Sequence, residues 1–484
     1  MLFNSYIFIL LFFPLTLAGY YGFNRVGRYK VAKVFLVVMS LWFYAYFHLS
    51  YLPLILGSIM INYLLGKMIR SHLGKKKAFL VWGISFNILL LFVFKYLGFT
   101  LRNINDLFDI SVAIPAILMP LGISFYTFQQ ISYLVDASRN EVPEHSFTDY
   151  FLFVSFFPQL VAGPIVKHSE MIPQFCDGKR KVFDDEYFAK GLYRFSKGLA
   201  KKVLLADTLS HAVDYGYINV NVISGPEAWI TAIMYSFQLY FDFSGYCDMA
   251  CGIANCFHID LPENFNNPYF ASSISDFWKR WHITLTSFLT KYVYIPLGGN
   301  RKGKVRTYLN IMIVYLVSGI WHGADWSFVL WGVMHGVALC FYRLCGKAWD
   351  KMPEFIRVFL TFIFVSIAWV FFRAESISEA LCFVKAMIFP GGTHFTPAFI
   401  EKFDVLELTY IEDHVGMLRR LTESYPLINM IVILLACVTV LGLEKRNSKK
   451  EFKPCLRNAM LCTILLVWSI LSLSGVSDFL YFNF

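Results

Sequence analysis

The chain has 484 residues, of which 57% are hydrophobic, 18% aromatic and only 16% charged. Soluble domains average about 45–50% apolar and about 25% charged residues, so this composition excludes an ordinary soluble protein. The net charge of +10 does not indicate nucleic-acid binding, because the basic residues cluster in short loops between apolar runs, where they set membrane orientation. We therefore predict a polytopic membrane protein embedded in lipid.

Nine apolar runs are candidate membrane spans, each to be compared with the requirement of about 20 apolar residues. The first of them, 6–23, lacks the basic leader and the small-residue cleavage site of a signal peptide, and we expect it to be a retained span. The candidate spans are 6–23, 31–48, 51–65, 78–98, 111–135, 227–255, 356–372, 425–443 and 457–474, and four ambiguous segments lie between them at 149–166, 188–207, 274–297 and 308–343.

Loop charges predict the orientation of these spans. The loops 24–33, 66–77 and 444–453 are the most basic, and such loops stay in the cytoplasm. Counting spans from them places the N-terminus, residues 373–424 and the C-terminus outside.

Two of the polar segments in the middle of the chain do not fit regular spans. Residues 156–175 contain Pro158, Pro164 and Pro173, which predict a broken or re-entrant element. Residues 188–207 alternate lysine and arginine with apolar residues at helical spacing, as an interfacial helix does.

Intramembrane carboxylates and a strongly charged segment follow. Asp242 and Asp248 are six residues apart, on opposite helical faces, so they are not a paired acid/base site. The two interpretations are that they line a polar passage or that they form hydrogen bonds to neighbouring groups. Residues 273–304 mix aromatics with Trp278, His282 and several cations. Because lipid-exposed helices do not tolerate so many charges, we predict a re-entrant or protein-buried segment there.

A glycine-rich turn, Gly298-x₄-Gly303-Lys304, resembles a nucleotide-binding P-loop. The next residue is Val305, so the Ser or Thr that would hold magnesium is missing, and no βαβ strand precedes the turn. The interpretations left are a turn before a cytoplasmic loop, or a basic rim that attracts a phosphate-bearing donor such as coenzyme A.

Segment 308–343 is too long for one span. As a single helix of 36 residues it would measure about 54 Å, against about 30 Å of hydrocarbon. Both flanks are basic, which places both ends in the cytoplasm. We therefore predict that the helix breaks near Gly319 or Gly323 and returns, with His322 at the break.

Two histidines, His322 and His335, lie within this segment. On a continuous helix they would be about 20 Å apart and on nearly opposite faces, so they can act together only if the helix breaks between them. No HxxxH or HExxH spacing is present, and we predict no metal site. Each imidazole is either a hydrogen-bonded packing residue or, because ionisable groups are costly at membrane depth, a functional one. Asp325, at i+3 from His322, is predicted to orient its ring.

Small residues on both halves of the segment are expected to bring neighbouring helices close together. They are Gly319 and Gly323 before the predicted break, and Gly332 and Gly336 after it. Glycine at such positions lets two helix backbones approach each other within the membrane.

Several motifs in order along the chain resemble the membrane-bound O-acyltransferase (MBOAT) family, and within it the bacterial branch that acetylates exported polysaccharides. The motifs are MLFNSYIFILLF at the start, FFPQLVAGPIVK (156–167), FDFSGYCDMACG (241–252), LPENFNNPYFASSISDFWKRWHITLTSFLTKYVYIPLGGNRKG (261–303), SGIWHGADWSFVLWGVMHG (318–336) and WVFFRAES (369–376). The similarity weakens through 377–460.

The resemblance implies a fold and a chemistry. The expected fold is an all-α polytopic membrane protein of roughly nine to twelve transmembrane helices, with re-entrant and interfacial helices enclosing a central tunnel. It is expected as one domain over 1–484, with N-terminal helices in 1–135, the tunnel core in 136–346 and C-terminal helices in 347–484. The expected reaction is acetyl transfer from cytoplasmic acetyl-CoA, a substrate and not a bound cofactor, to a hydroxyl.

The resemblance also implies site residues and partners. His322 matches the family's catalytic histidine, and His335 the second histidine of the motif. Weaker expectations for substrate or donor binding are Trp278, His282, Asn300, Arg301, Lys302 and Asp325. The branch passes acetyl groups to an extracytoplasmic SGNH-type protein, and its members lie in the bacterial cytoplasmic (inner) membrane.

Alternatives remain open from the residues. A transporter or flippase for an acylated or lipid-linked molecule would also contain intramembrane polar residues and broken helices, although no internal repeat is found between the halves. A non-catalytic scaffold for polysaccharide export is the third class. Within the enzyme class the acceptor could be alginate, peptidoglycan, cellulose or another glycan, and D-alanylation of teichoic acid matches the motifs less well.

Overall fold

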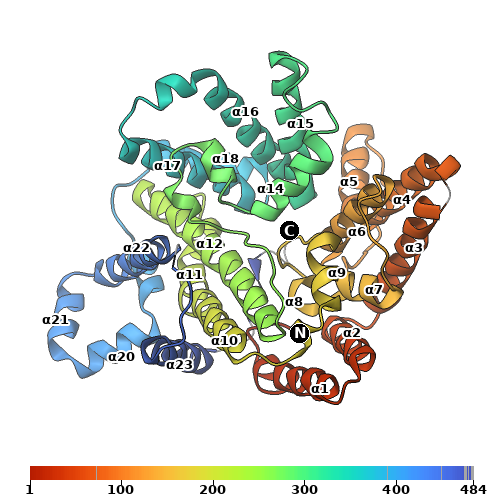
Figure 1. Ribbon diagram of the computed structural model, residues 1–484. Coiled ribbons are helices and arrows are strands. Elements are labelled where there is room, and N and C mark those ends of the chain that lie inside the picture. Colours follow the sequence, from red (N-terminus) through yellow and green to blue (C-terminus); the bar gives the residue numbers. More distant parts are fainter. Residues whose placement is uncertain (72, 390, 449, 474–476, 478, 481–484) are drawn as a thin grey trace. The chain divides into compact units, whose positions relative to one another are not determined.

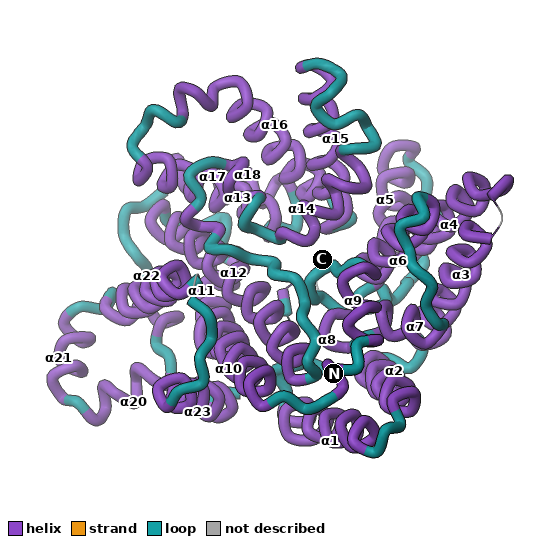
Figure 2. The backbone as a smooth tube through the Cα atoms, in the orientation of Figure 1, coloured by secondary structure: helices purple, strands orange, loops and turns teal. Residues whose placement is uncertain are grey.

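The computed structural model describes residues 1–484 except 72, 390, 449, 474–476, 478 and 481–484. The described residues form helices joined by loops and contain no strand, as Figure 2 shows in purple and teal. This confirms the predicted all-α class. The last residue of the predicted span 457–474 lies outside the described residues.

The chain groups into two compact units. The first comprises Met1–Leu199, Tyr246–Glu263 and Phe452–Phe484, and the second comprises Ala200–Gly245 and Asn264–Glu451. One long helix, α12 (Gly225–Cys256), contributes residues to both units.

The helices of the first unit are labelled in Figure 1 and occupy the N-terminal part of the chain, with α23 from its end. They are η1 Phe8–Phe12, α1 Phe13–Arg25, α2 Tyr29–Ala45, α3 Tyr51–Ser71, η2 Leu73–Lys75, α4 Lys76–Leu91, η3 Phe92–Tyr96, α5 Leu97–Phe108, α6 Ile123–Ser138, α7 Phe147–Ser155, α8 Phe157–Leu160, α9 His168–Cys176, η4 Lys179–Lys181, α10 Asp185–Ala200 and α23 Leu456–Leu471.

The helices of the second unit include the histidine-bearing segment. They are η5 Lys201–Ala206, α11 Asp207–Ile218, η6 Pro268–Phe270, α13 Ile274–Trp278, α14 Ile283–Leu289, η7 Thr290–Tyr294, α15 Lys304–His322, α16 Trp326–Trp349, α17 Glu354–Arg373, α18 Ile377–Ile388, α19 Pro397–Ile400, η8 Glu401–Phe403, α20 Leu406–His414, α21 Gly416–Ser424 and α22 Ile428–Asn447.

Five helices in the described part of the chain are long and apolar enough to cross a membrane. They are Tyr51–Ser71, Lys76–Phe108, Trp326–Trp349, Glu354–Arg373 and Ile428–Asn447. Four of them overlap predicted spans, and Trp326–Trp349 is the second half of the long segment 308–343. The protein is therefore a polytopic membrane protein, as predicted.

The predicted span 111–135 is wrong. Residues 110–120 form no helix, and α6 begins only at Ile123, after Gly122 with φ +73°. Pro115 and Pro120 explain the difference, because proline removes a backbone donor and disfavours helical conformation in the residue before it. Apolar composition alone therefore overestimated this span.

The proline-rich segment 156–175 is broken, as predicted. α7 ends at Ser155, and Phe156 leaves the helical region with φ −54° and ψ 111°. Pro158 then lies in the first turn of the four-residue helix α8, where proline is tolerated. A new helix, α9, begins at His168.

The prediction of an interfacial helix over 188–207 is wrong at its C-terminal end. Lys201 and Lys202 are only 5% and 2% exposed, whereas an interfacial helix presents its cations to water and headgroups. The Nζ atom of Lys202 lies 2.8 Å from carboxylate oxygens of both Asp207 and Asp242, and Lys201 pairs with Glu444. Burial is possible because each cation has an anionic partner.

Candidate active site

The long histidine-bearing segment breaks at Gly323, one of the two predicted positions. α15 ends at His322, and Gly323 is extended, with φ −155° and ψ 156°. Asp325 then caps α16 by accepting a hydrogen bond of 2.9 Å from the backbone N–H of Ser327. The chain therefore turns within three residues, and α15 and α16 pack against each other (Figure 1).

Two glycines allow this close packing. A Cβ atom on Gly319 would lie 2.3 Å from the carbonyl oxygen of Phe328 and 3.2 Å from Cα of Gly332. A Cβ atom on Gly332 would lie 2.4 Å from the carbonyl oxygen of Tyr315. The predicted role of these small residues in helix approach is confirmed.

The break brings His322 and His335 onto one buried aromatic side chain. The ring centroid of Trp331 lies 5.1 Å from that of His322 and 4.7 Å from that of His335. Trp331 and His335 are fully buried, and His322 is 4% exposed. The two histidines therefore share one site, which a continuous helix would have prevented.

Helix α17 completes this aromatic cluster. Its Trp369 ring stacks on Trp331 at 5.7 Å, and its Phe372 ring lies 5.2 Å from the His322 ring. We call His322, His335, Trp331, Trp369 and Phe372 the histidine cluster. All its members belong to the second unit.

Trp278 contacts His335 directly. Its indole Nε1–H donates a hydrogen bond of 3.2 Å to Nδ1 of His335. Because indole is only a donor, Nδ1 must be an acceptor, and a neutral His335 then has its proton on Nε2. That Nε2 atom is buried and has no hydrogen-bond partner among the described residues, so it can donate to a ligand.

His282 lies beside His322, with 6.4 Å between the ring centroids. It begins α14 in a left-handed conformation, with φ 44°. Its Nδ1 lies 3.0 Å from the side-chain oxygen of Asn264, which also accepts hydrogen bonds from the backbone N–H and hydroxyl of Thr284. An oxygen with these partners assigns the His282 proton to Nδ1.

The predicted role of Asp325 is not supported by its geometry. The prediction required Asp325 and His322 to be three residues apart on one helix, but α15 ends at His322. The Asp325 carboxylate instead caps α16.

Asn300, Arg301 and Lys302 lie far from the histidine cluster. They are exposed residues of the turn before α15, at the opposite end of a helix that extends about 27 Å to His322. Asn310 holds the turn by donating a hydrogen bond of 2.8 Å to the carbonyl oxygen of Gly299. These residues cannot contact a group that reacts at His322.

Sequence reasoning missed Asn264, Trp331, Trp369 and Phe372. Trp331 precedes His335 by four residues, so the same-face spacing of a helix was a usable signal. The other three reach the site from elsewhere in the chain, and no local spacing reveals them.

No group of three or more His, Cys, Asp or Glu side chains suited to a metal occurs among the described residues.

Comparisons with known proteins give a family match and several relatives. The family pattern of MBOAT, membrane-bound O-acyltransferase, matches residues 36–377, a range that includes the whole histidine cluster. A peptidoglycan O-acetyltransferase of Helicobacter pylori is 39% identical, covering 100% of this chain and 98% of that protein.

Two other groups of relatives are informative. A probable alginate O-acetylase of Pseudomonas aeruginosa is 38% identical over 81% of this chain and 76% of its own length. A teichoic acid D-alanyltransferase of Bacillus subtilis is 26% identical over 53% of this chain and 69% of its own length. The similarity is thus higher and longer to the O-acetylating proteins.

Proposed function

Because this chain is an acyltransferase of the membrane-bound O-acyltransferase family, we propose that it takes acetyl from cytoplasmic acetyl-CoA and transfers it across the membrane for O-acetylation of a cell-envelope polysaccharide. The observation that carries the proposal is the break at Gly323, which places His322 and His335 on the same buried indole. Peptidoglycan is favoured over alginate as the polymer, because the peptidoglycan O-acetyltransferase matches this chain over its entire length.

In this mechanism His322 is the general base. The acceptor hydroxyl oxygen attacks the acetyl carbonyl carbon while His322 takes the hydroxyl proton, a contribution of about 10²–10⁴-fold. The Nε2–H group of His335 donates to the oxyanion that forms. The carbon–sulfur bond then breaks, and the departing thiolate takes the proton from His322.

The two histidines are distinguished by their hydrogen bonds. Nδ1 of His335 already accepts the indole N–H of Trp278, so a neutral His335 presents a donor to the site. A donor suits oxyanion stabilisation better than proton abstraction. His282, whose ring centroid lies 6.4 Å from that of His322, is proposed to help position the acceptor.

Arg301, Lys302 and Asn300 are proposed to hold the phosphates of acetyl-CoA. They are exposed and basic or polar, and the length of α15 separates them from His322. The long pantetheine arm of coenzyme A separates its phosphates from its thioester, which fits such a division. An extracytoplasmic SGNH-type protein is the proposed recipient of the acetyl group.

Substitution of His322 by alanine tests the proposal. Purified protein is incubated with acetyl-labelled acetyl-CoA and its acceptor protein or glycan, and label transfer is measured. We expect transfer by the wild type and a loss of at least about 10²-fold in His322→Ala, with unchanged abundance in the membrane. His211→Ala, at an exposed position of α11, is the matched control.

The outcome also separates the other function classes. A transporter or a scaffold would give no acetyl transfer by the purified wild-type protein. Polymer acetylation that persists in cells carrying His322→Ala would refute the assignment of the base.

A further inference from the structure

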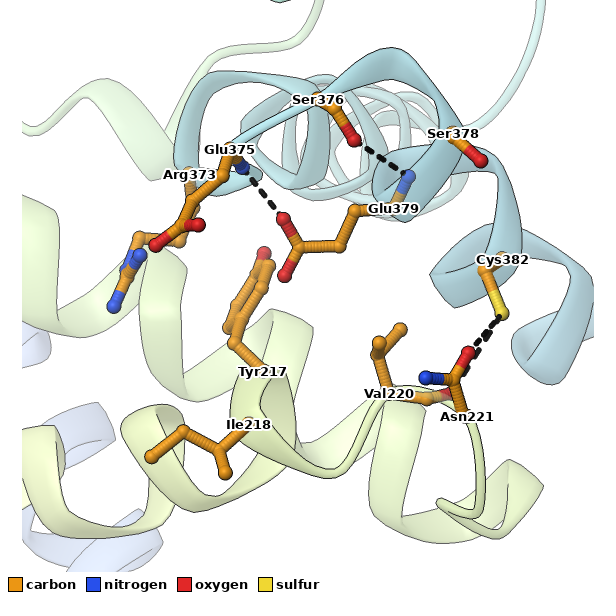
Figure 3. A pocket seen from close by; sticks show the side chains of 10 residues that line it. All are labelled: Tyr217, Ile218, Val220, Asn221, Arg373, Glu375, Ser376, Ser378, Glu379 and Cys382. Carbon is orange, nitrogen blue, oxygen red and sulfur yellow. Dashed lines mark hydrogen bonds between the residues drawn. The ribbon is translucent and has the colours of Figure 1, made fainter.

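A polar pocket lies directly beyond the histidine cluster in the second unit. Its volume is about 510 Å³, and Figure 3 shows its lining from the end of α11, the loop after it, the end of α17 and the start of α18. The lining residues are Tyr217, Ile218, Val220, Asn221, Arg373, Glu375, Ser376, Ser378, Glu379 and Cys382. We call this the α17–α18 pocket.

The α17–α18 pocket is joined to the histidine cluster by adjacent residues of one helix. Phe372, whose ring lies 5.2 Å from the rings of both His322 and Trp331, is followed by Arg373 of the pocket. The α17–α18 pocket and the histidine cluster therefore both include residues from the C-terminal end of α17. The loop charges predict that residues 373–424 face the outside, where the proposed function delivers the acetyl group.

Two carboxylates give the pocket its charge. The carboxylate of Glu379 is fixed by the backbone N–H of Glu375, which donates a hydrogen bond of 2.6 Å to it. Neither Glu375 nor Glu379 has a cationic partner among the described residues. The guanidinium of Arg373, which also lines the pocket, pairs instead with Asp214 at 3.0 Å. The two carboxylates of the pocket can therefore bind a cationic group of a ligand.

A buried hydroxyl group is directed into the same space. Tyr217 is 4% exposed, and its hydroxyl has no hydrogen-bond partner among the described residues. In Figure 3 this hydroxyl is directed toward the side of the pocket where the carboxylate of Glu379 lies. Because a buried hydroxyl without a partner is unfavourable, a ligand with a hydrogen-bonding group stabilises it.

The residue types in and beside the pocket favour a protein ligand over a saccharide. Sugars commonly stack on exposed aromatic rings, but the one aromatic residue of the lining is buried, with the Arg373 guanidinium 5.1 Å above its ring. The lining residue Ile218 is 79% exposed, and Val222, which directly follows the lining residue Asn221 in the chain, is 80% exposed. Apolar side chains around a charged centre are typical of protein interfaces.

We propose that the α17–α18 pocket binds a basic segment of a partner protein, with an arginine or lysine side chain between Glu375 and Glu379 and apolar neighbours on Ile218 and Val222. An arginine suits this pocket best, because its five donors can satisfy both carboxylates and the Tyr217 hydroxyl. The inference that this partner is the acetyl recipient rests on the proposed function. The binding itself does not.

Binding is tested on the full-length protein in detergent, by titration with the blocked tripeptide Ala-Arg-Ala. We expect saturable binding, at least about tenfold tighter than binding of Ala-Gln-Ala. The double variant Glu375→Gln/Glu379→Gln should weaken the binding of Ala-Arg-Ala about tenfold or more, and Tyr217→Phe should weaken it several-fold. The matched control is Glu354→Gln, at the other end of α17, about 28 Å away along the helix.

Three results would overturn the proposal. They are equal binding of the two tripeptides, binding that the pocket variants leave unchanged, and binding of an N-acetylglucosamine trimer that those variants abolish. The last result would assign the pocket to a glycan.

Acetyl-CoA turnover and polymer acetylation are measured in separate experiments. The double variant should retain acetyl-CoA turnover by the purified protein while lowering polymer acetylation in cells. His322→Ala should lose turnover and still bind Ala-Arg-Ala. Failure of acetyl transfer in the wild type would therefore refute the proposed function and leave the binding result standing.

Discussion

At the scale of single residues, the hydrogen bond from Trp278 determines which nitrogen of His335 faces the reaction. The donor on Trp278 occupies Nδ1, and this leaves the proton on Nε2, where an oxyanion can use it. A ring without that bond could adopt the other tautomer, in which Nε2 is an acceptor. In the proposed mechanism the role of His335 as a donor thus depends on Trp278.

Substitution Trp278→Phe removes the donor and keeps most of the ring volume. We expect kcat to fall about five- to tenfold, the equivalent of one hydrogen bond, with little change in KM for acetyl-CoA. His335→Ala should lower kcat further, by about 10²–10³-fold. The measurement is the initial rate of acetyl transfer. Trp326→Phe, at an exposed position that begins α16, is the control, and a full rate in Trp278→Phe would contradict the assignment.

At the scale of elements, the turn between α15 and α16 depends on how closely the two helices approach. Gly319 faces the backbone of α16, where a Cβ atom would lie 2.3 Å from the Phe328 carbonyl oxygen. That contact is with backbone, so it can be relieved only by moving one helix away from the other. Such a movement would change the distances from His322, at the end of α15, to Trp331 and His335 on α16.

We therefore expect Gly319→Val to reduce acetyl transfer by about 10²-fold, because a displacement of about 1 Å at a reacting group has an effect of that size. The same assay measures it, together with membrane abundance as a check of folding. Gly346→Ala is the matched control on α16, because its new Cβ would make only an ordinary contact of 3.8 Å with the Tyr342 ring. Equal losses in the two variants would contradict this explanation.

Much of the helix pair α15 and α16 could be predicted from the sequence on physical grounds. The length of segment 308–343 and its basic flanks predicted a break, and glycine identified where it could occur. The same reasoning failed at 111–135, where apolar composition concealed Pro115 and Pro120. It also failed at Lys201 and Lys202, because Glu444 and Asp242, which pair with them in addition to the nearby Asp207, lie far along the chain.

Some residues of the candidate site could likewise be identified from the sequence, and others could not. His322 and His335 were identifiable because ionisable groups are costly within a membrane. The hydrogen bond from Trp278 to His335 joins residues 57 positions apart, and Asn264 reaches His282 across 18 positions. Such contacts depend on tertiary packing, so no sequence spacing predicts them.

At the scale of the whole molecule, charge differs between the two ends of the proposed reaction path in the second unit. The turn with Arg301 and Lys302 is basic and is predicted to face the cytoplasm. The α17–α18 pocket is acidic and is predicted to face outside, since α17 (Glu354–Arg373) is long enough to cross the membrane. Acetyl-CoA is anionic, so this charge distribution favours its entry from the cytoplasmic side.

The orientation can be tested with epitope tags inserted at two positions of the otherwise intact chain. One tag follows Lys302, and the other follows Val415, in the turn between α20 and α21. In intact spheroplasts we expect antibody to reach only the tag after Val415, and in permeabilised spheroplasts both tags. Membrane abundance equal to that of the untagged protein shows that each tagged protein is folded. Labelling of both tags in intact spheroplasts would contradict the orientation, and with it the entry of acetyl-CoA at Arg301 and Lys302, because that turn would then lie outside with no access to the cytoplasmic donor.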